Sequence, residues 1–179
     1  CKYLIWAAGE YQYPKKNSFQ GDELCLHFSE IKSFSRLEGD ERVVIGGYES
    51  GFDAAINLIM SGSEVILIDS SDNLERIGSD SSYTLSPYTR DRIKLIYNDL
   101  NYYKNTSVEN VHHDGDFYVV TTSNGDSIVS RNEPINCTGF DTSITLVKEL
   151  FDHDNGYPLI NDYDESSKTE NLFLVGPQV

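Results

Sequence analysis

Residues Arg42 to Asp69 read RVVIGGYESGFDAAINLIMSGSEVILID, and this stretch decides the predicted fold. It begins with the apolar run Val43 to Ile45, which is typical of a strand buried on both faces. A glycine-rich turn follows, and apolar residues then recur at helical spacing from Phe52 to Ile59. A second apolar run, Val65 to Ile68, ends at an acid. The order strand, turn, helix, strand predicts a βαβ unit of the dinucleotide-binding kind.

The turn and the residues around it form the predicted cofactor site. Gly46 and Gly47 allow the backbone to turn sharply where the strand ends. The helix should begin near Ser50, and its unpaired N–H groups and positive dipole end favour a pyrophosphate there. The acid after the second strand can accept hydrogen bonds from a ribose diol. The predicted cofactor-binding residues of this unit are Gly46, Gly47, Tyr48, Glu49, Ser50, Gly51 and Asp69.

Two residues of the turn depart from the usual pattern. Tyr48 stands where the dinucleotide fingerprint has a second glycine, and a bulky side chain there can weaken affinity. Glu49 places an acid beside the proposed phosphate, and its side chain is expected to point to solvent. A purely structural βαβ turn that binds no nucleotide is therefore an alternative interpretation.

Composition and charge exclude several classes of function. The chain has 179 residues, of which 39% are hydrophobic and 24% charged, as expected for a globular domain with a sizeable core. Its formal net charge of −15 argues against nucleic acid and anionic membranes as partners. No membrane span or signal peptide is evident. The three scattered cysteines fit a reducing compartment, which predicts a cytoplasmic location. No second histidine or cysteine falls at metal-ligand spacing, so no metal is predicted.

Strands and helices alternate along the chain, which predicts an α/β fold with a Rossmann-like parallel sheet flanked by helices. A helix capped by Thr89 is expected over Thr89 to Tyr103, and Val108 to His112 should be the third parallel strand. Alternating runs around Asn124-Gly125 predict an antiparallel β-hairpin in the crossover. Shorter strands are expected at Tyr3–Ala8, Glu23–His27, Pro134–Thr138 and Leu172–Val175, helical turns at Ser29–Phe34 and Ser143–Phe151, an extended segment at Pro158–Ile160, and loops at Asn17–Asp22 and Ser70–Pro87.

Five motifs follow one another in a fixed order. They are I-W-A-A-G-E-Y-Q-Y-P (Ile5–Pro14), F-Q-G-D-E-L-C-L-H-F-S (Phe19–Ser29), the turn G-G-Y-E-S-G, N-C-T-G-F (Asn136–Phe140) and N-L-F-L-V-G-P (Asn171–Pro177). Together they resemble the flavin-containing monooxygenase family and its two-dinucleotide flavoprotein relatives. The first and fourth are similar to that family's two A-T-G crossing strands, the second to its F-x-G-x-x-x-H fingerprint with a longer gap, and the third to its G-x-G-x-S-G turn. The fifth looks like the strand that returns to the flavin domain.

The resemblance implies an NAD(P)H-binding domain inserted into an FAD-binding domain. Residues 1–179 would be a single NAD(P)H-binding domain, with both ends crossing to an FAD domain of the parent chain. The resemblance implies an oxidoreductase of monooxygenase type that presents the nicotinamide to FAD for hydride transfer, and Thr138 and Gly139 would contact the cofactor. We expect this chain alone to purify without flavin and to be inactive.

The sequence leaves the choice between NADPH and NADH open. Asp69 favours NADH because a carboxylate would repel a 2′-phosphate, whereas the resemblance favours NADPH. Ser70, Ser71, Arg76 and Arg90 could accommodate that phosphate, although Arg90 could equally be a solvated arginine in the first turn of a helix.

Two alternatives concern function. The thioredoxin-reductase branch of the same flavoproteins resembles this chain less, because no C-x-x-C precedes the turn and Cys25 is followed by Leu-His-Phe. A non-catalytic nucleotide-binding or interaction domain would have the same Rossmann-like fold, and fold alone does not separate it from an enzyme.

Overall fold

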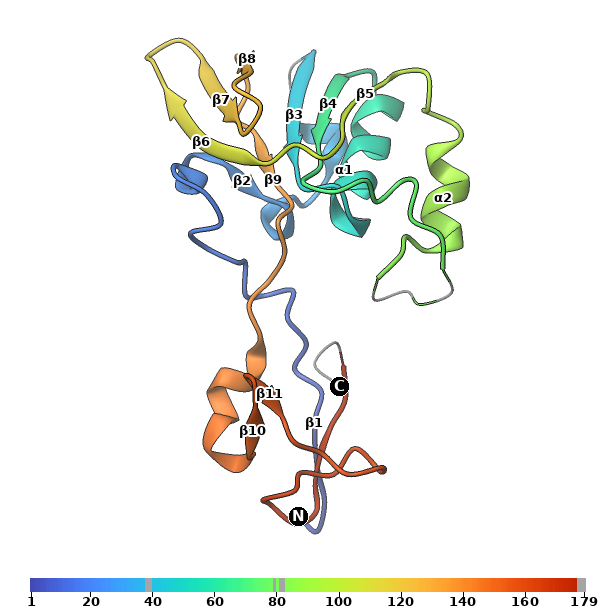
Figure 1. Cartoon of the computed structure of the whole chain (residues 1–179), viewed down its shortest axis with the longest axis vertical. Helices are drawn as coiled ribbons and strands as arrows, with labels where there is room; N and C mark the ends of the chain where they lie inside the picture. Colours follow the sequence, from blue (N-terminus) through green and yellow to red (C-terminus); the bar gives the residue numbers. More distant parts are fainter. Residues whose placement is uncertain (38–39, 79, 81–82, 177–179) are drawn as a thin grey trace. The chain divides into compact units, whose positions relative to one another are not determined.

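The computed structural model describes residues 1–37, 40–78, 80 and 83–176, which form two compact units (Figure 1). The first unit joins Cys1–Pro14 to the chain from Phe140 onward, and the second comprises Lys15–Gly139. The two ends of the chain, expected to be crossover segments, thus make up the first unit. Its assignment to an FAD domain stays a prediction.

The second unit contains the predicted parallel sheet. Its strand order is β2-β9-β3-β4-β5, and all neighbouring strands run parallel. The βαβ unit is confirmed, since α1 connects β3 to the adjacent strand β4. The bounds are β2 Leu26–His27, β9 Ile135–Asn136, β3 Glu41–Ile45, β4 Glu64–Ile68, β5 Leu100–Tyr103, α1 Glu49–Met60 and α2 Pro87–Ile93.

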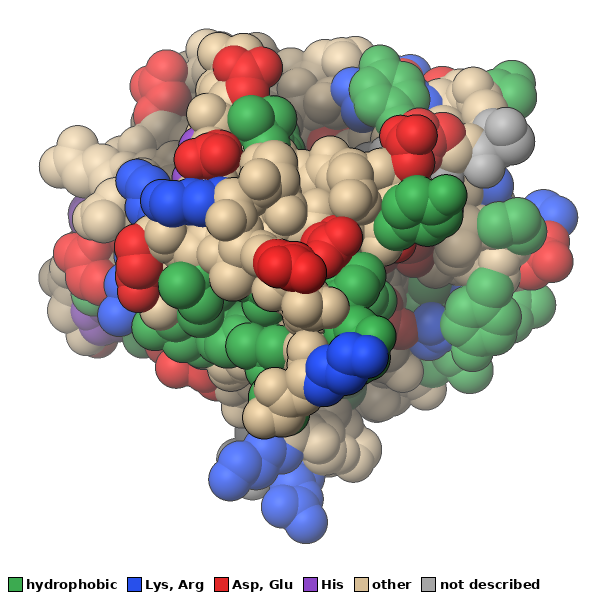
Figure 2. All heavy atoms as spheres, turned by 90° about the horizontal axis from the view of Figure 1, so that it is seen from below, with side chains coloured by type: hydrophobic (Ala, Val, Ile, Leu, Met, Phe, Trp, Pro, Cys, Tyr) green, Lys and Arg blue, Asp and Glu red, His purple; other side chains and the backbone are tan. Residues whose placement is uncertain are grey.

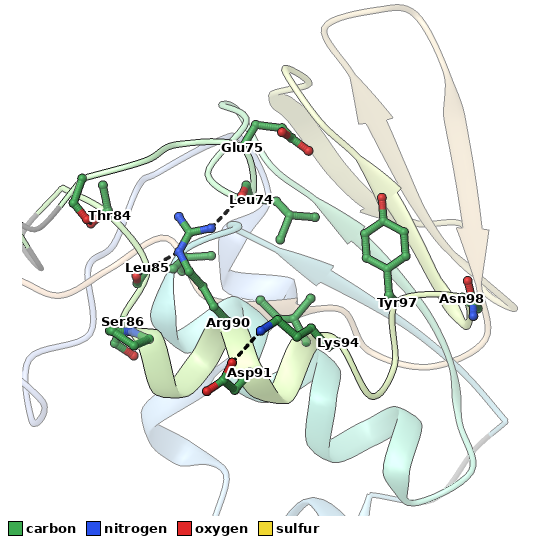
Figure 3. Close-up of a pocket in the computed structure, with 13 residues that line it drawn as sticks. Leu74, Glu75, Thr84, Leu85, Ser86, Arg90, Asp91, Lys94, Tyr97 and Asn98 are labelled. Carbon is green, nitrogen blue, oxygen red and sulfur yellow. Dashed lines mark hydrogen bonds and ion pairs between the residues drawn. The ribbon is translucent and has the colours of Figure 1, made fainter.

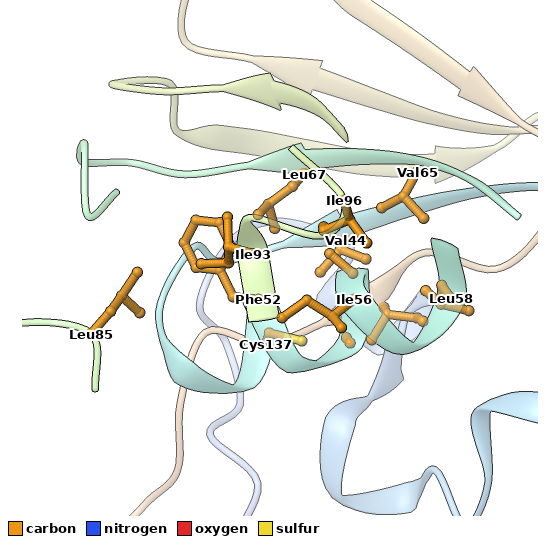
Figure 4. Close-up of a cluster of buried hydrophobic side chains, with 13 residues drawn as sticks. Val44, Phe52, Ile56, Leu58, Val65, Leu67, Leu85, Ile93, Ile96 and Cys137 are labelled. Carbon is orange, nitrogen blue, oxygen red and sulfur yellow. The ribbon is translucent and has the colours of Figure 1, made fainter. Parts of the chain in front are cut away.

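Different layers cover the two faces of this sheet because side chains alternate along each strand. Val44 belongs to a cluster with residues of α1 and with Ile93 of α2, so the helices lie on one face (Figure 4). Val43 and Ile45 belong to a second cluster with the antiparallel sheet β6-β7-β8, which lies on the other face (Figure 1). The strands of that sheet are β6 Val108–His113, β7 Tyr118–Thr122 and β8 Ser127–Ser130.

Two predictions between residues 89 and 113 are wrong. The helix α2 begins after Ser86, whose hydroxyl accepts a hydrogen bond from the Thr89 N–H, and it ends at Ile93. Residues Leu100–Tyr103 form β5, which is the third parallel strand, whereas Val108–His113 pairs antiparallel with β7. Leu100 fits the helical spacing of Ile93 and Ile96, but Leu100 and Tyr102 also alternate with exposed neighbours. Pairing with β4 overrides the local helical pattern.

The hairpin prediction is confirmed. β7 and β8 pair antiparallel through the turn that contains Asn124 and Gly125, and Gly125 has a positive φ of 85°. The predicted loop Ser70–Pro87 contains Ser79, Ser81 and Ser82, which lie outside the described residues.

The first unit is held together by the pairing of the two chain ends. β1 (Leu4–Trp6) runs parallel to β12 (Leu172–Leu174), as part of each predicted terminal strand. The predicted helical segment is a 3₁₀ helix with a kink, η4 (Ser143–Leu150), and β10 (His153–Asp154) pairs antiparallel with β11 (Tyr157–Pro158). Pro177 of the last motif lies outside the described residues. The other 3₁₀ helices are η1 Asp22–Leu24, η2 Phe28–Glu30 and η3 Phe34–Arg36.

The surface carries both signs of charge. On the face shown in Figure 2, acidic and basic side chains are interspersed among polar and hydrophobic ones. No helix within the described ranges is long and apolar enough to cross a membrane.

Two of the three cysteines are buried. Cys137 belongs to the cluster of Figure 4, and Cys25 packs beneath the antiparallel sheet. Burial raises the pKa of the Cys25 thiol to about 12, and burial also raises the pKa of the Cys137 thiol. The folded chain therefore keeps thiol protons that the unfolded chain loses above about pH 9, so stability should fall as the pH rises towards the folded-state values.

We expect only one of the three thiols to react quickly in the folded chain. Thiolate is the reactive form, so Cys1, which is exposed, should be modified fast by a disulfide reagent at pH 8, and Cys25 and Cys137 only on unfolding. Stopped-flow thiol counting with and without denaturant measures this. Three fast thiols in the native chain would contradict the burial of the other two.

Candidate functional site

Three glycines shape the turn between β3 and α1. Gly46 has a φ of 108°, and a Cβ on it would come within 2.5 Å of the carbonyl oxygen of Cys137. A Cβ on Gly47 would collide with the Asp69 carboxylate, and one on Gly51 with the carbonyl oxygen of Gly46. The three positions therefore accept only glycine without rearrangement, and at Gly51 the reason is the close approach of α1 to the end of β3.

The start of α1 leaves backbone donors available beside this turn. Tyr48 is the N-cap residue, and its carbonyl accepts the first intrahelical hydrogen bond, from the Phe52 N–H. The N–H groups of residues 49 to 51 have no carbonyl four positions earlier within the helix, and they point out of its N-terminus. The positive end of the helix dipole is at the same place, so the geometry fits a phosphate group.

A cavity of about 200 Å³ lies at the carboxyl ends of the parallel strands. Such edges are where ligands bind in open α/β sheets. The cavity brings together the predicted residues Gly46, Ser70 and Thr138. It also contains Lys15, a cation that the sequence analysis missed because no local pattern marks it. The remaining lining residues are Ser18, Phe19, Ile45, Ile68, Thr106, Ser107 and Val108.

The segment after β9 is fixed by internal hydrogen bonds. The Thr138 N–H donates to the Asn136 side-chain oxygen at 3.0 Å, and the Thr138 hydroxyl lies 2.8 Å from the Ser18 hydroxyl. The Gly139 carbonyl accepts a hydrogen bond from the Lys15 N–H at 3.2 Å and lies 3.0 Å from Nε2 of the buried His27. Thr138 is thus held at the rim of the cavity, and Gly139 is anchored next to it.

Asp69 is buried, with 1% of its surface exposed. Its carboxylate accepts hydrogen bonds from the N–H groups of Ser71 (2.9 Å) and Asn73 (3.0 Å) and from the Tyr102 hydroxyl (2.6 Å). Burial and this last hydrogen bond raise the pKa of Tyr102. In this structure Asp69 organises the loop after β4, and its contact with a ribose stays a prediction.

The expected orientation of Glu49 is wrong. Its carboxylate accepts hydrogen bonds from the Ser86 N–H and, at 2.5 Å, from the Thr89 hydroxyl. Ser86 and Thr89 belong to the N-terminus of α2, where backbone donors and the helix dipole attract a negative charge. The sequence analysis missed this contact because the partners are far away in the chain.

Arg90 is not the solvated arginine of the alternative interpretation. Its guanidinium donates hydrogen bonds to the carbonyl oxygens of Leu85 (3.2 Å) and Leu74 (2.9 Å), which Figure 3 shows, and to that of Arg76. It therefore ties the loop after β4 to α2, beside a cavity of about 740 Å³. The guanidinium of Arg76 instead lies 4.7 Å from the centre of the Tyr83 ring.

The chain matches a known protein family over nearly its whole length. A family model described as pyridine nucleotide-disulphide oxidoreductase matches residues 1–176. A curated relative, the bacilliredoxin reductase Bdr of Bacillus subtilis (strain 168), is 23% identical over 185 residues, which cover 97% of this chain and 53% of the relative.

Solved structures show the same fold. The bacillithiol disulfide reductase Bdr from Bacillus cereus matches with a TM-score of 0.71 and 23% identity, over 98% of this chain and 53% of that one. The thioredoxin reductase of T. acidophilum matches with a TM-score of 0.75 and 17% identity, over 99% and 58% respectively. The chain therefore spans about half the length of these relatives. These matches confirm the predicted α/β fold class and the resemblance to FAD- and NAD(P)-dependent oxidoreductases.

Proposed function

The chain belongs to the pyridine nucleotide-disulphide oxidoreductase family, and from that premise we propose that it is the NAD(P)H-binding portion of a flavin-dependent oxidoreductase. The observation that carries the proposal is the close approach of α1 to β3. The glycines at 46, 47 and 51 leave no room for a Cβ, and they place the open end of α1 at the carboxyl edge of the sheet.

The residues have distinct tasks in this proposal. The backbone of residues 46 to 51 holds the pyrophosphate through N–H groups. The adenosine half lies towards the end of β4, near Ser70, and the nicotinamide half lies towards β9, near Thr138. A bound nicotinamide dinucleotide supplies a hydride, and the protein supplies its position. FAD would be held by a part of the parent chain that corresponds to the other half of the relatives.

The names of the relatives favour a reductase over a monooxygenase. The first relatives are called bacilliredoxin reductase and bacillithiol disulfide reductase. We therefore propose that the parent protein reduces a disulfide. A monooxygenase is the second candidate, and the Phe19–Ser29 motif favours it. A cytoplasmic location is part of the proposal and rests on composition alone.

Calorimetric titration of the 179-residue chain with NADH and NADPH tests the binding function. We expect one site per chain for at least one of the two, and competition by ADP-ribose, which contains the pyrophosphate and adenosine. A heat signal absent for NADH, NADPH and ADP-ribose would leave the alternative, an interaction domain with the same fold, as the better account.

A further inference from the structure

We propose that Tyr48 and Glu49 are positioning residues that set the affinity for the adenosine half of the dinucleotide. The inference rests on the proposed function and deepens it. Both residues stand in the turn itself, and both side chains reach the same distant segment, Thr84–Thr89, which connects the loop after β4 to α2.

The contacts form a clasp between the turn and this segment. The Tyr48 hydroxyl donates a hydrogen bond to the Thr84 carbonyl oxygen at 3.1 Å. The Glu49 carboxylate accepts from the Ser86 N–H and from the Thr89 hydroxyl. Thr84 and Thr89 are both buried, whereas Tyr48 and Glu49 are half-buried. A hydrogen bond in such a place fixes geometry more strictly than one in water.

The clasp also explains how an acid is tolerated beside a phosphate site. A carboxylate in the first turn of α1 would repel a pyrophosphate at the same helix end. The Glu49 oxygens are instead engaged by donors of Ser86 and Thr89, at the N-terminus of α2. The charge of the Glu49 carboxylate is therefore satisfied at α2, and the backbone N–H groups of the turn stay available for a pyrophosphate.

The strand that precedes the clasped segment indicates which half of the ligand the clasp affects. The clasped segment follows β4, which lies on one side of β3, whereas Thr138 follows β9 on the other side. In sheets of this order the first βαβ unit carries the adenosine half of a dinucleotide. Arg90 also stabilises the clasped segment, because its guanidinium donates hydrogen bonds to the Leu85 and Leu74 carbonyl oxygens.

The experiment compares fragments of the dinucleotide on two conservative variants. Tyr48→Phe removes one hydroxyl, and Glu49→Gln removes the charge while keeping the shape. Titration with ADP-ribose, NADH and reduced nicotinamide mononucleotide should show about threefold to tenfold weaker binding of the first two and unchanged binding of the third.

Asp53→Asn is the matched control. It breaks the ion pair between Asp53 and Arg92 (2.5 Å), which also ties α1 to α2 but lies one turn further along α1. We expect it to leave the binding of all three ligands unchanged while the melting temperature reports any loss of helix packing. The inference would be overturned if Asp53→Asn also weakened ADP-ribose and NADH selectively. It would equally be overturned if Tyr48→Phe and Glu49→Gln weakened the binding of ADP-ribose and of the mononucleotide to the same extent. Absence of ADP-ribose and NADH binding by the unmodified chain would instead overturn the proposed function, and the inference with it.

Discussion

Replacement of Gly51 by alanine should weaken dinucleotide binding by about tenfold to a hundredfold. A Cβ at this position would collide with the Gly46 carbonyl oxygen, so the start of α1 must move away from β3. Overpacking of this kind costs about 1–3 kcal/mol, and 1.4 kcal/mol corresponds to about tenfold in affinity. Gly51→Leu should abolish binding. Calorimetry with NADH and NADPH, together with thermal unfolding, measures both effects.

The sign of the stability change makes this test sharp. Alanine in place of glycine within a helix normally stabilises by about 0.5–1 kcal/mol, and here we expect destabilisation. Met60→Ala is the control, because Met60 is exposed at the far end of the same helix and should leave binding unchanged. Undiminished binding of both cofactors by Gly51→Ala and Gly51→Leu would place the nucleotide elsewhere.

The sequence predicted the features that depend on neighbouring residues. The run from Val43 to Ile68 contains strand, turn and helix signals in their own local order, and the structure has all of them. The hairpin at Asn124-Gly125 is equally local. The close approach at Gly51 belongs to the same local pattern, because the third glycine of such a turn serves helix–strand packing.

The misses depend on partners far away in the chain. Leu100 fits both a helical and an alternating pattern, and only its pairing opposite Val65 decides for a strand. Glu49 is placed by donors of Ser86 and Thr89, which no turn pattern indicates. Arg90 binds three carbonyl oxygens, and backbone acceptors leave no signal in the sequence. Local pattern thus predicts the elements here, and tertiary contacts determine which way polar side chains point.

Those contacts change the expectation for cofactor choice. Arg76 and Arg90 were both candidates for reading a 2′-phosphate, but the Arg90 guanidinium is engaged by Leu74, Leu85 and Arg76 carbonyl oxygens. Arg90→Ala should therefore lower the melting temperature and weaken NADPH and NADH equally. Charge-assisted hydrogen bonds of this kind are worth about 1.5–3 kcal/mol each.

Arg76→Ala should weaken the binding of NADPH about fivefold or more and leave the binding of NADH unchanged. This result would show that the unmodified domain prefers NADPH. Two unit charges at 4 Å interact by about 1 kcal/mol in water and about 4 kcal/mol at intermediate dielectric, so one arginine can offset the repulsion by Asp69. Titration of both cofactors at low and high salt measures the effect, which should shrink with salt.

Lys94→Ala is the control, since Lys94 is exposed on the segment that follows α2 and pairs with Asp91. If neither arginine variant weakens NADPH more than NADH, these cations do not read the 2′-phosphate. Asp69 is then the better guide, and the domain prefers NADH.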